Sequence, residues 1–175
     1  KKFEVILLYS GIDDGSSELK EFKAMDVKFI DISALSDKLL EEQITKESID
    51  ILIDLSGFTS QSRSMIAAYK PAPITINWLG FPGSMGFYDG KPLYDFLLSD
   101  NYIIPKNLEA YYAEKIIKLP NCYQPNISNR PSLKALTKKD YGIEENTFVF
   151  ASFGQSIKIT ENIFNIWLDL LKRKN

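Results

Sequence analysis

The fold class of this 175-residue chain is decided by one stretch, Ile51-Leu52-Ile53-Asp54-Leu55-Ser56-Gly57-Phe58-Thr59. Residues 51–55 are β-branched or apolar at nearly every position, which predicts a strand buried on both faces in the middle of a parallel sheet. The run ends at Ser56-Gly57, and a helix is expected to follow from about Ser60 to Tyr69. A buried strand that leads through a short loop into a helix is the repeating unit of α/β proteins.

The same alternation of short apolar runs and helical patterns continues on both sides of this stretch. Strands are predicted at Phe3–Tyr9, Val27–Ile30, Ile74–Trp78, Tyr94–Leu98, Lys115–Lys118 and Thr147–Phe153, and helices at Ser16–Met25, at Leu35–Lys46 and from about Thr160 onward. Strands that alternate with helices in this way indicate βα units. We therefore predict an α/β fold built on a Rossmann-like parallel sheet.

The composition changes between Leu119 and Asn146, where three prolines and several Asn and Ser residues interrupt the periodic patterns. We expect residues 1–120 to form most of one Rossmann-like lobe, residues 121–146 to form a linker, and residues 147–175 to form the first βα unit of a second lobe. One strand and one helix cannot bury their own apolar faces. Residues 147–175 are therefore expected either to pack back on the first sheet or to belong to an incomplete second domain.

The composition excludes several kinds of chemistry. The chain has no histidine and a single cysteine, Cys122, so it lacks a Ser-His-Asp triad, an imidazole base and a Cys/His zinc site. The 21 Lys and Arg residues against 23 Asp and Glu give a net charge of −2, which offers no basic surface for nucleic acid. The apolar runs are far shorter than the ~20 residues of a membrane-spanning helix, and a single thiol suits a reducing compartment. We expect a cytoplasmic protein with neither nucleic-acid nor membrane partners.

Ligands of open α/β sheets bind at the loops that follow the carboxyl ends of the strands. In the loop after Ile51–Leu55, Gly57 permits close backbone approach, and the alternative interpretation is a plain helix cap by Thr59 or Ser60. Asp54, at the end of that strand, could be a base or a ribose ligand, but a hydrogen-bonded structural Asp is the simpler interpretation.

Two further loops are candidates. Leu79–Gly86 has three glycines in eight residues, so its N–H groups could hold an anion or sugar hydroxyls, although an ordinary surface turn is the alternative. Gly154–Lys158 leads into the last predicted helix, and Lys158 there opposes the helix dipole unless an anion is bound. A phosphate would turn this conflict into a favourable site; the alternative is a solvated lysine.

These loops lie in a pattern that resembles the O-GlcNAc transferase and SPINDLY family, and most closely its bacterial SPINDLY-like branch. The resemblance rests on Ile51–Thr59, Lys70-Pro71-Ala72-Pro73-Ile74, Trp78–Ser84 with Gly86, Leu119-Pro120, Cys122–Pro125 and Phe150–Thr160. It implies a partial two-lobe architecture of the GT-B type. It also implies an enzyme that transfers GlcNAc from UDP or fucose from GDP to Ser/Thr hydroxyls of proteins. The implied partners are a nucleotide sugar and a protein or peptide acceptor, with no cofactor and no metal.

The resemblance also assigns roles to individual residues. Lys158 matches the lysine that neutralises the donor diphosphate, and Gln155 matches a Gln or Asn that contacts the nucleotide or its phosphates. The residues implied to line the catalytic cleft are Gly57, Phe58, Thr59, Gly80, Pro82, Gly83 and Ser84. No catalytic base is assigned.

The departures from the family pattern favour a second interpretation. Phe58 stands where relatives commonly carry His or Tyr, which removes a polar group from the cleft. The match begins within the first lobe and ends after one βα unit of the second, so the chain is expected to be a fragment that is inactive by itself. Its unpaired strand and apolar helix face predict self-association. The alternative function is a degenerate, non-catalytic binding module of glycosyltransferase type.

Overall fold

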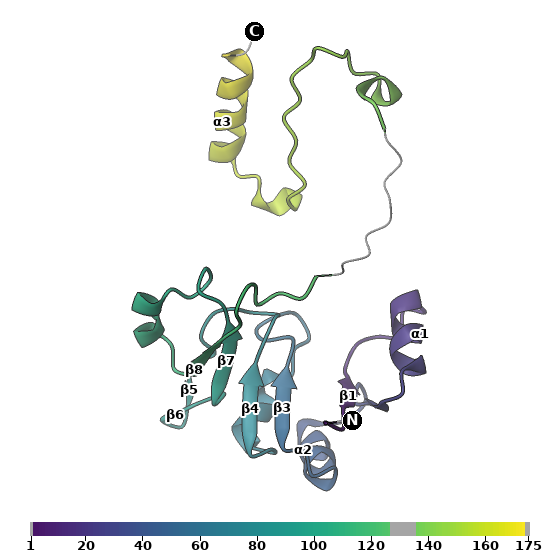
Figure 1. Ribbon diagram of the computed structural model, residues 1–175, viewed down its shortest axis with the longest axis vertical. Helices are drawn as coiled ribbons and strands as arrows, with labels where there is room; N and C mark the ends of the chain where they lie inside the picture. The colour runs from purple at the N-terminus through teal and green to yellow at the C-terminus, as the bar shows by residue number, and fades with distance from the viewer. Residues whose placement is uncertain (1, 127–135, 174–175) are drawn as a thin grey trace. The chain divides into compact units, whose positions relative to one another are not determined.

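The computed structural model describes residues 2–126 and 136–173, and the chain divides into two compact units, Lys1–Asn126 and Ile127–Asn175 (Figure 1). The boundary between the units falls inside the predicted linker, residues 121–146. Residues 127–135 of that linker lie outside the described residues.

The first unit alternates strands with helices. Its elements are β1 (Ile6–Tyr9), α1 (Ser17–Ala24), β2 (Lys28–Asp31), α2 (Asp37–Lys46), β3 (Ile51–Asp54), the 3-10 helix η1 (Ser64–Tyr69), β4 (Ile74–Asn77), β5 (Phe87–Tyr88), β6 (Lys91–Pro92), β7 (Phe96–Ser99), the 3-10 helix η2 (Lys106–Tyr111) and β8 (Lys115–Lys118). β1 and β2 form a parallel pair, and β3, β4, β7 and β8 form a parallel sheet in that order. β5 and β6 form a short antiparallel hairpin. The α/β class with parallel sheets is confirmed.

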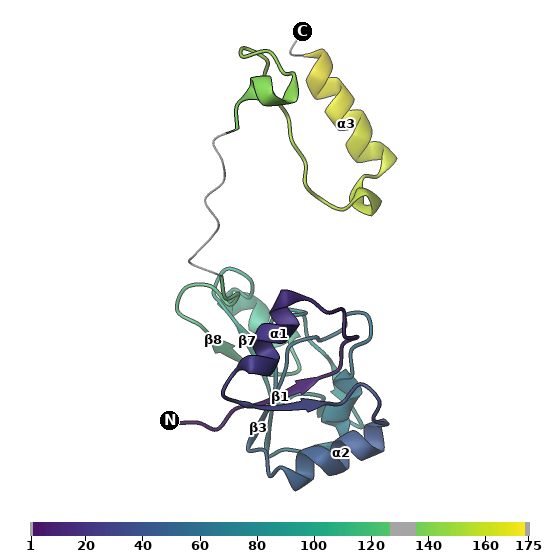
Figure 2. The same cartoon turned by 90° about the vertical axis from the view of Figure 1, so that its right-hand side faces the viewer.

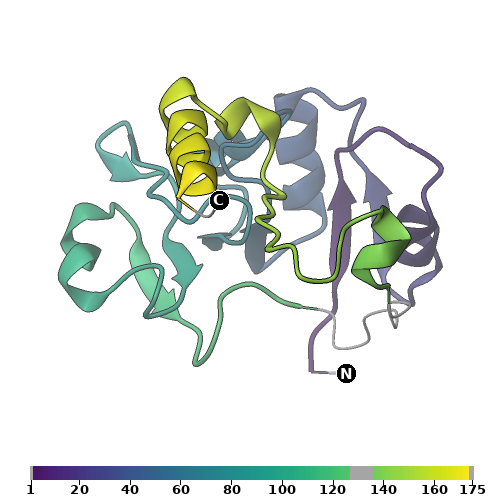
Figure 3. The ribbon, with the colours of Figure 1, turned by 90° about the horizontal axis from the view of Figure 1, so that it is seen from above.

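Both α-helices of this unit begin where the sequence provides a capping serine. The Ser16 side chain accepts a hydrogen bond from the N–H of Leu19 at 3.2 Å, which caps α1. Figure 2 views the unit from the side of α1, with β1 behind it, and Figure 3 shows β1 and β2 side by side. α2 buries Leu40 and Ile44, which lie one turn apart on the same face.

Two apolar clusters hold the unit together. The larger joins α2, β3 and η1 and is extended by half-buried residues of β1 and β2; its buried members are Ile32, Leu40, Ile44, Leu52, Ile66 and Ala72. The smaller lies under the loop after β4, and its buried members are Ala67, Met85, Leu93 and Tyr94. Because β1 and β2 contribute Leu8 and Ile30 to the larger cluster, the two parallel sheets share one core.

The prediction that residues 51–55 are buried on both faces is wrong. Leu52 is 9% exposed, but Ile51 and Ile53 are 45% and 44% exposed. The reason is that β3 is the edge strand of its sheet, and α2 and η1 pack side chains against only the face that carries Leu52.

The helix predicted from Ser60 to Tyr69 is also shorter than expected. Only Ser64–Tyr69 is helical, and it is a 3-10 helix without a side-chain cap. Gln61 adopts a positive φ of 62°, which a right-handed helix cannot include. The hydroxyl of Ser64 contacts Asp54 at the end of β3, so this segment is shaped by a tertiary contact.

The second unit contains η3 (Lys138–Tyr141), η4 (Ser156–Lys158) and α3 (Glu161–Lys172). α3 begins where predicted, and the Thr160 side chain caps it. The strand predicted at Thr147–Phe153 is not formed, because the described part of this unit offers no second strand to satisfy its backbone groups. Residues 147–153 are therefore irregular backbone, and η4 and α3 follow them.

Tyr123, in the segment after β8, is hydrogen-bonded to the rest of the first unit. The carboxylate of Asp100 accepts the N–H of Tyr123 at 2.9 Å, and the indole N–H of Trp78 donates to the carbonyl of Tyr123 at 2.8 Å. Asp100 also accepts the N–H groups of Tyr102 and Ile103, each at 2.8 Å. Both hydrogen bonds join Tyr123 to a residue that is distant in the sequence.

This contact should be released by acid. The N–H groups of Ile103 and Tyr123 lower the pKa of Asp100, so its stabilisation is present above the unfolded value of about 3.9 and is lost as the pH falls through the lower folded value. Fluorescence of Trp78, in a Trp167→Phe background, should therefore change below about pH 4. Asp100→Asn should abolish this transition, and Asp89→Asn, in the exposed turn between β5 and β6, should retain it. Identical acid curves for wild type and Asp100→Asn would contradict the assignment.

Candidate functional site

Two of the predicted ligand loops meet at the carboxyl ends of β3 and β4. Asp54 and Asn77 are paired in register where these strands end. An added Cβ on Gly57 would lie 2.6 Å from Cβ of Phe81, and one on Gly80 would lie 2.2 Å from the carbonyl oxygen of Ser56. The structure thus brings Gly57 and Gly80 together, and it explains both glycines by the close approach of one loop to the other.

Asp54 supports the loop after β3 through hydrogen bonds to its backbone. Its Oδ1 accepts the N–H groups of Ser56 at 2.8 Å and Gly57 at 3.3 Å. Its Oδ2 accepts the Tyr94 hydroxyl at 2.5 Å and lies 2.9 Å from the hydroxyl oxygen of Ser64. Burial raises the pKa of Tyr94, and its hydrogen bond to Asp54 raises it further, so the phenol stays a donor. Asp54 is a structural residue, as the simpler interpretation had it.

The surface that the two loops present is partly aromatic. Phe58 is 56% exposed, and its ring lies against that of Phe81 with centroids 5.5 Å apart. Phe81 is fixed in turn, because its carbonyl accepts the side-chain amide of Asn77 at 3.0 Å and an added Cβ on Gly83 would lie 2.6 Å from its ring. The carbonyl of Pro82 accepts the Tyr112 hydroxyl at 3.4 Å. The position of Phe58 is therefore apolar and held in place.

Backbone donors remain available on both loops. The N–H groups of Phe58, Thr59 and Gly83 make no hydrogen bond with any residue in the described ranges. Phe58 and Thr59 are exposed and Gly83 is half-buried. Unpaired N–H groups on a fixed loop suit oxygen-rich ligands such as sugars and phosphates. The hydroxyl of Ser84, in contrast, donates to the buried Glu114 at 2.8 Å and faces the protein.

Lys158 and Gln155 belong to the second unit. Gln155 precedes η4, and Lys158 is its last residue, two positions before Thr160, the N-cap of α3. Both residues are exposed, and within residues 2–126 and 136–173 no carboxylate forms an ion pair with Lys158. The ammonium group is therefore free to bind an anion. Because Lys158 lies outside α3, the dipole conflict expected from the sequence is small.

Residues 1–129 match the glycosyl transferase family 41. The chain belongs to this family. It is 32% identical over 176 residues to a probable UDP-N-acetylglucosamine–peptide N-acetylglucosaminyltransferase SEC of Arabidopsis thaliana, and 26% identical over 174 residues to the corresponding SPINDLY protein of Solanum lycopersicum. These matches cover 97% and 95% of this chain but only 18% of each relative.

The solved structures give the same assignment. A mutant O-GlcNAc transferase of Thermobaculum terrenum aligns with a TM-score of 0.65 and 27% identity over 74% of this chain and 24% of that chain. The family 41 chain thus has the α/β architecture of the GT-B glycosyltransferases, of which it represents a part. The described residues include no helix long and apolar enough to cross a membrane.

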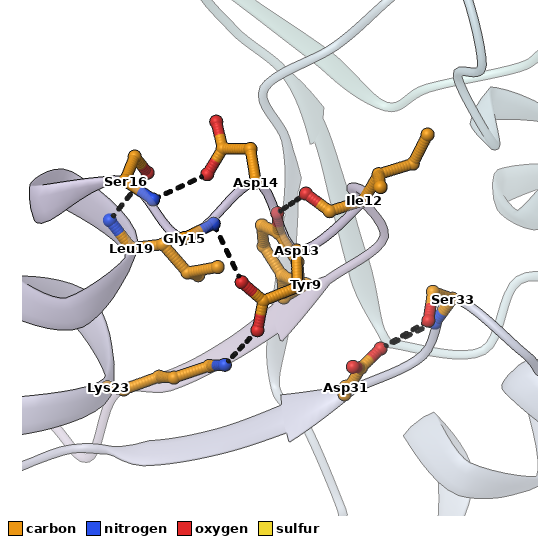
Figure 4. A network of polar contacts seen from close by, with 10 residues as sticks. All are labelled: Tyr9, Ile12, Asp13, Asp14, Gly15, Ser16, Leu19, Lys23, Asp31 and Ser33. Atoms are coloured by element: carbon orange, nitrogen blue, oxygen red, sulfur yellow. Dashed lines mark hydrogen bonds and ion pairs between the residues drawn. The ribbon is translucent and has the colours of Figure 1, made fainter.

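A second polar cluster in the family 41 chain lies at the carboxyl ends of β1 and β2 (Figure 4). Asp13 accepts Lys23 at 2.7 Å and the N–H of Gly15 at 3.0 Å, and Asp31 accepts the hydroxyl of Ser33 at 2.6 Å. The hydrogen bond from Lys23 lowers the pKa of Asp13. Both carboxylates are thus already hydrogen-bonded to residues of their own turns or to Lys23. Among the described residues, no group of three or more Cys, Asp or Glu side chains could hold a metal.

Sequence reasoning missed three residues that support the site. Tyr94 bonds Asp54, which holds the first loop; Ser64 bonds the carbonyl of Gly57, and Glu114 bonds Ser84 of the second loop. No local signal marks them, because Tyr94 lies 40 residues from Asp54 and Glu114 lies 30 residues from Ser84. Only an alignment of relatives could have drawn attention to them before the structure was known.

Proposed function

We propose that this chain is part of an enzyme that transfers GlcNAc from UDP or fucose from GDP to Ser or Thr hydroxyls of proteins. The observation that carries the proposal is the match of residues 1–129 to a glycosyltransferase family, combined with two loops that meet at the carboxyl edge of a parallel sheet. That edge is where α/β proteins bind ligands. The free N–H groups of Phe58, Thr59 and Gly83 are suited to sugar or acceptor oxygens.

Residues of each unit would have a separate role in the transfer. Lys158 would neutralise the negative charge that develops on the nucleoside diphosphate as the sugar leaves, and Gln155 would orient the nucleotide. This charge compensation by an ammonium group removes the need for a metal ion. The loops of the first unit would hold the sugar and the acceptor hydroxyl. The chain spans 18% of the length of each of these relatives.

The role of Lys158 can be tested by nucleotide binding. UDP and GDP should stabilise the chain against heat, and Lys158→Ala should weaken their affinity about tenfold or more, because a charge-assisted hydrogen bond to phosphate is lost. UMP and GMP, which lack the second phosphate, should be affected much less. Lys172→Ala, at the exposed far end of α3, is the matched control and should bind as the wild type does. Equal affinities for wild type and Lys158→Ala would refute the phosphate role.

Phe58 favours a second candidate, a non-catalytic binding module. Its exposed ring leans on Phe81 and offers no polar group to a substrate. The full polypeptide that carries this segment distinguishes the two functions. Release of UDP or GDP from the nucleotide sugar, coupled to sugar on a Ser/Thr peptide, supports the enzyme. Nucleotide binding without any turnover supports the module.

A further inference from the structure

Glu114 is a buried carboxylate whose presence needs an explanation. It is 4% exposed, and no Lys or Arg among the described residues forms an ion pair with it. Burying a charged carboxylate is unfavourable unless hydrogen bonds compensate for the lost water. The groups that donate to Glu114 therefore indicate what it does.

Both oxygens of Glu114 bind the Gly80–Gly86 loop. Oε1 accepts the N–H of Met85 at 2.7 Å, and Oε2 accepts the hydroxyl of Ser84 at 2.8 Å. The Ser84 oxygen in turn accepts the N–H groups of Gly86 at 3.1 Å and Ala113 at 3.2 Å. The hydroxyl thus uses its one proton and both lone pairs inside the protein.

The same loop is fixed at two further points. The Met85 side chain is buried in the smaller apolar cluster beside Tyr94. Asn77 donates to the carbonyl of Phe81. Together with Glu114, these contacts hold the loop from its inner side and leave the N–H of Gly83 free.

We propose that Glu114 is a positioning residue, which fixes Ser84, Met85 and Gly86 so that the Gly-rich loop presents its free backbone donors in one geometry. The inference rests on the proposed function, in which this loop contacts the sugar or the acceptor hydroxyl. Donors that are fixed before the ligand arrives need no reorganisation during the reaction.

Glutamine has the shape of Glu114 but cannot replace it. If its oxygen accepts the N–H of Met85, its NH₂ group faces the Ser84 oxygen, whose lone pairs are already used by Gly86 and Ala113. If the amide is reversed, its NH₂ group opposes the N–H of Met85. Either orientation sacrifices at least one contact to the loop.

Amide hydrogen exchange of the 175-residue chain provides the first test. In Glu114→Gln, the N–H of Met85 or Gly86 should exchange about tenfold faster or more, while amides within β7 and β8 keep their wild-type rates. Glu109→Gln is the matched control, because Glu109 pairs with Lys118 at 2.8 Å and does not contact the loop. Unchanged exchange at both amides would overturn the proposal.

A second variant covers the case in which Glu114→Gln loosens the whole unit. Ser84→Ala removes the acceptor of Gly86 without leaving a new charge, so it should speed exchange of Gly86 locally. The double variant should add little to either single change, because the two residues act as one network. A uniform rise across β7 and β8 in both single variants would show a general structural role and overturn the proposal.

Kinetics of the full polypeptide that carries this segment provide the last test. Glu114→Gln should raise KM for the nucleotide sugar or for the acceptor peptide about tenfold, while Glu109→Gln changes neither. If both KM values and kcat are unchanged despite faster exchange, the role of Glu114 in function is overturned. If the wild type transfers no sugar, the proposed function fails, and amide exchange alone decides whether Glu114 positions the loop.

Discussion

Gly80→Ala is expected to destabilise the first unit by about 3 kcal/mol or more, a large effect for one methyl group. The added Cβ would lie 2.2 Å from the carbonyl oxygen of Ser56 and 2.6 Å from that of Leu55. Both are backbone atoms of the neighbouring loop, so no side-chain rotation relieves the overlap. The loops at the carboxyl ends of β3 and β4 would have to separate. Urea unfolding followed by Trp78 fluorescence, in a Trp167→Phe background, measures the loss.

Gly86→Ala is the control from the same loop. Gly86 has a φ of +75° and nothing within 4 Å of an added Cβ. Its substitution should therefore cost only the left-handed backbone penalty, about 1 kcal/mol. If the two substitutions destabilise the protein equally, overlap with the Ser56 and Leu55 carbonyls does not explain the requirement for Gly80.

Asp54→Ala is the second change with a large expected effect, a loss of about 3 kcal/mol. It removes the acceptor for the N–H groups of Ser56 and Gly57, and it leaves the buried Tyr94 hydroxyl with only the Ser64 carbonyl, at 3.0 Å, as acceptor. A buried donor without a partner costs about 1–3 kcal/mol, and partial exposure of Asp54 lets water compensate for some of the loss. The urea midpoint of the variant gives the measured value.

Two substitutions with smaller expected effects serve as comparisons for Asp54→Ala. Tyr94→Phe removes one hydrogen bond and keeps the ring in the core, so it should cost about 1 kcal/mol. Asp50→Ala, at the exposed position before β3, should change stability by less than about 0.5 kcal/mol. A loss in Asp54→Ala no larger than in Asp50→Ala would mean that Asp54 does not hold the loop.

Both large effects act on the same place in the molecule. Gly80 allows the loop after β4 to contact the backbone of the loop after β3, and Asp54 fixes the backbone of the loop after β3 for this contact. The candidate site thus depends on how its loops are supported as much as on the residues that face a ligand. This support is why Glu114 and Tyr94 matter although neither is exposed.

The sequence predicted the features that arise from neighbouring residues. Alternating apolar runs located the strands, and Ser16 and Thr160 marked helix starts, because capping and periodicity act within one or two turns. The loop motifs were sufficient to recognise the family that residues 1–129 match.

Part of the candidate site was also predictable, but its physical basis was not. Gly57 was identified as a position of close backbone approach and Gly80 as part of a Gly-rich ligand loop, whereas the structure shows that each loop approaches the other. Thr147–Phe153 has the composition of a strand and forms none, because a strand exists only with a partner.

The sequence by itself therefore determined the family, the α/β class and the positions of most elements. Only the tertiary structure decided that Ile51 and Ile53 are exposed, that Tyr94 binds Asp54 and that Glu114 binds the Gly-rich loop. Burial depends on which elements pack over a strand, and these hydrogen bonds join residues about 30–40 positions apart. Neither property is encoded in the few residues on either side of a position.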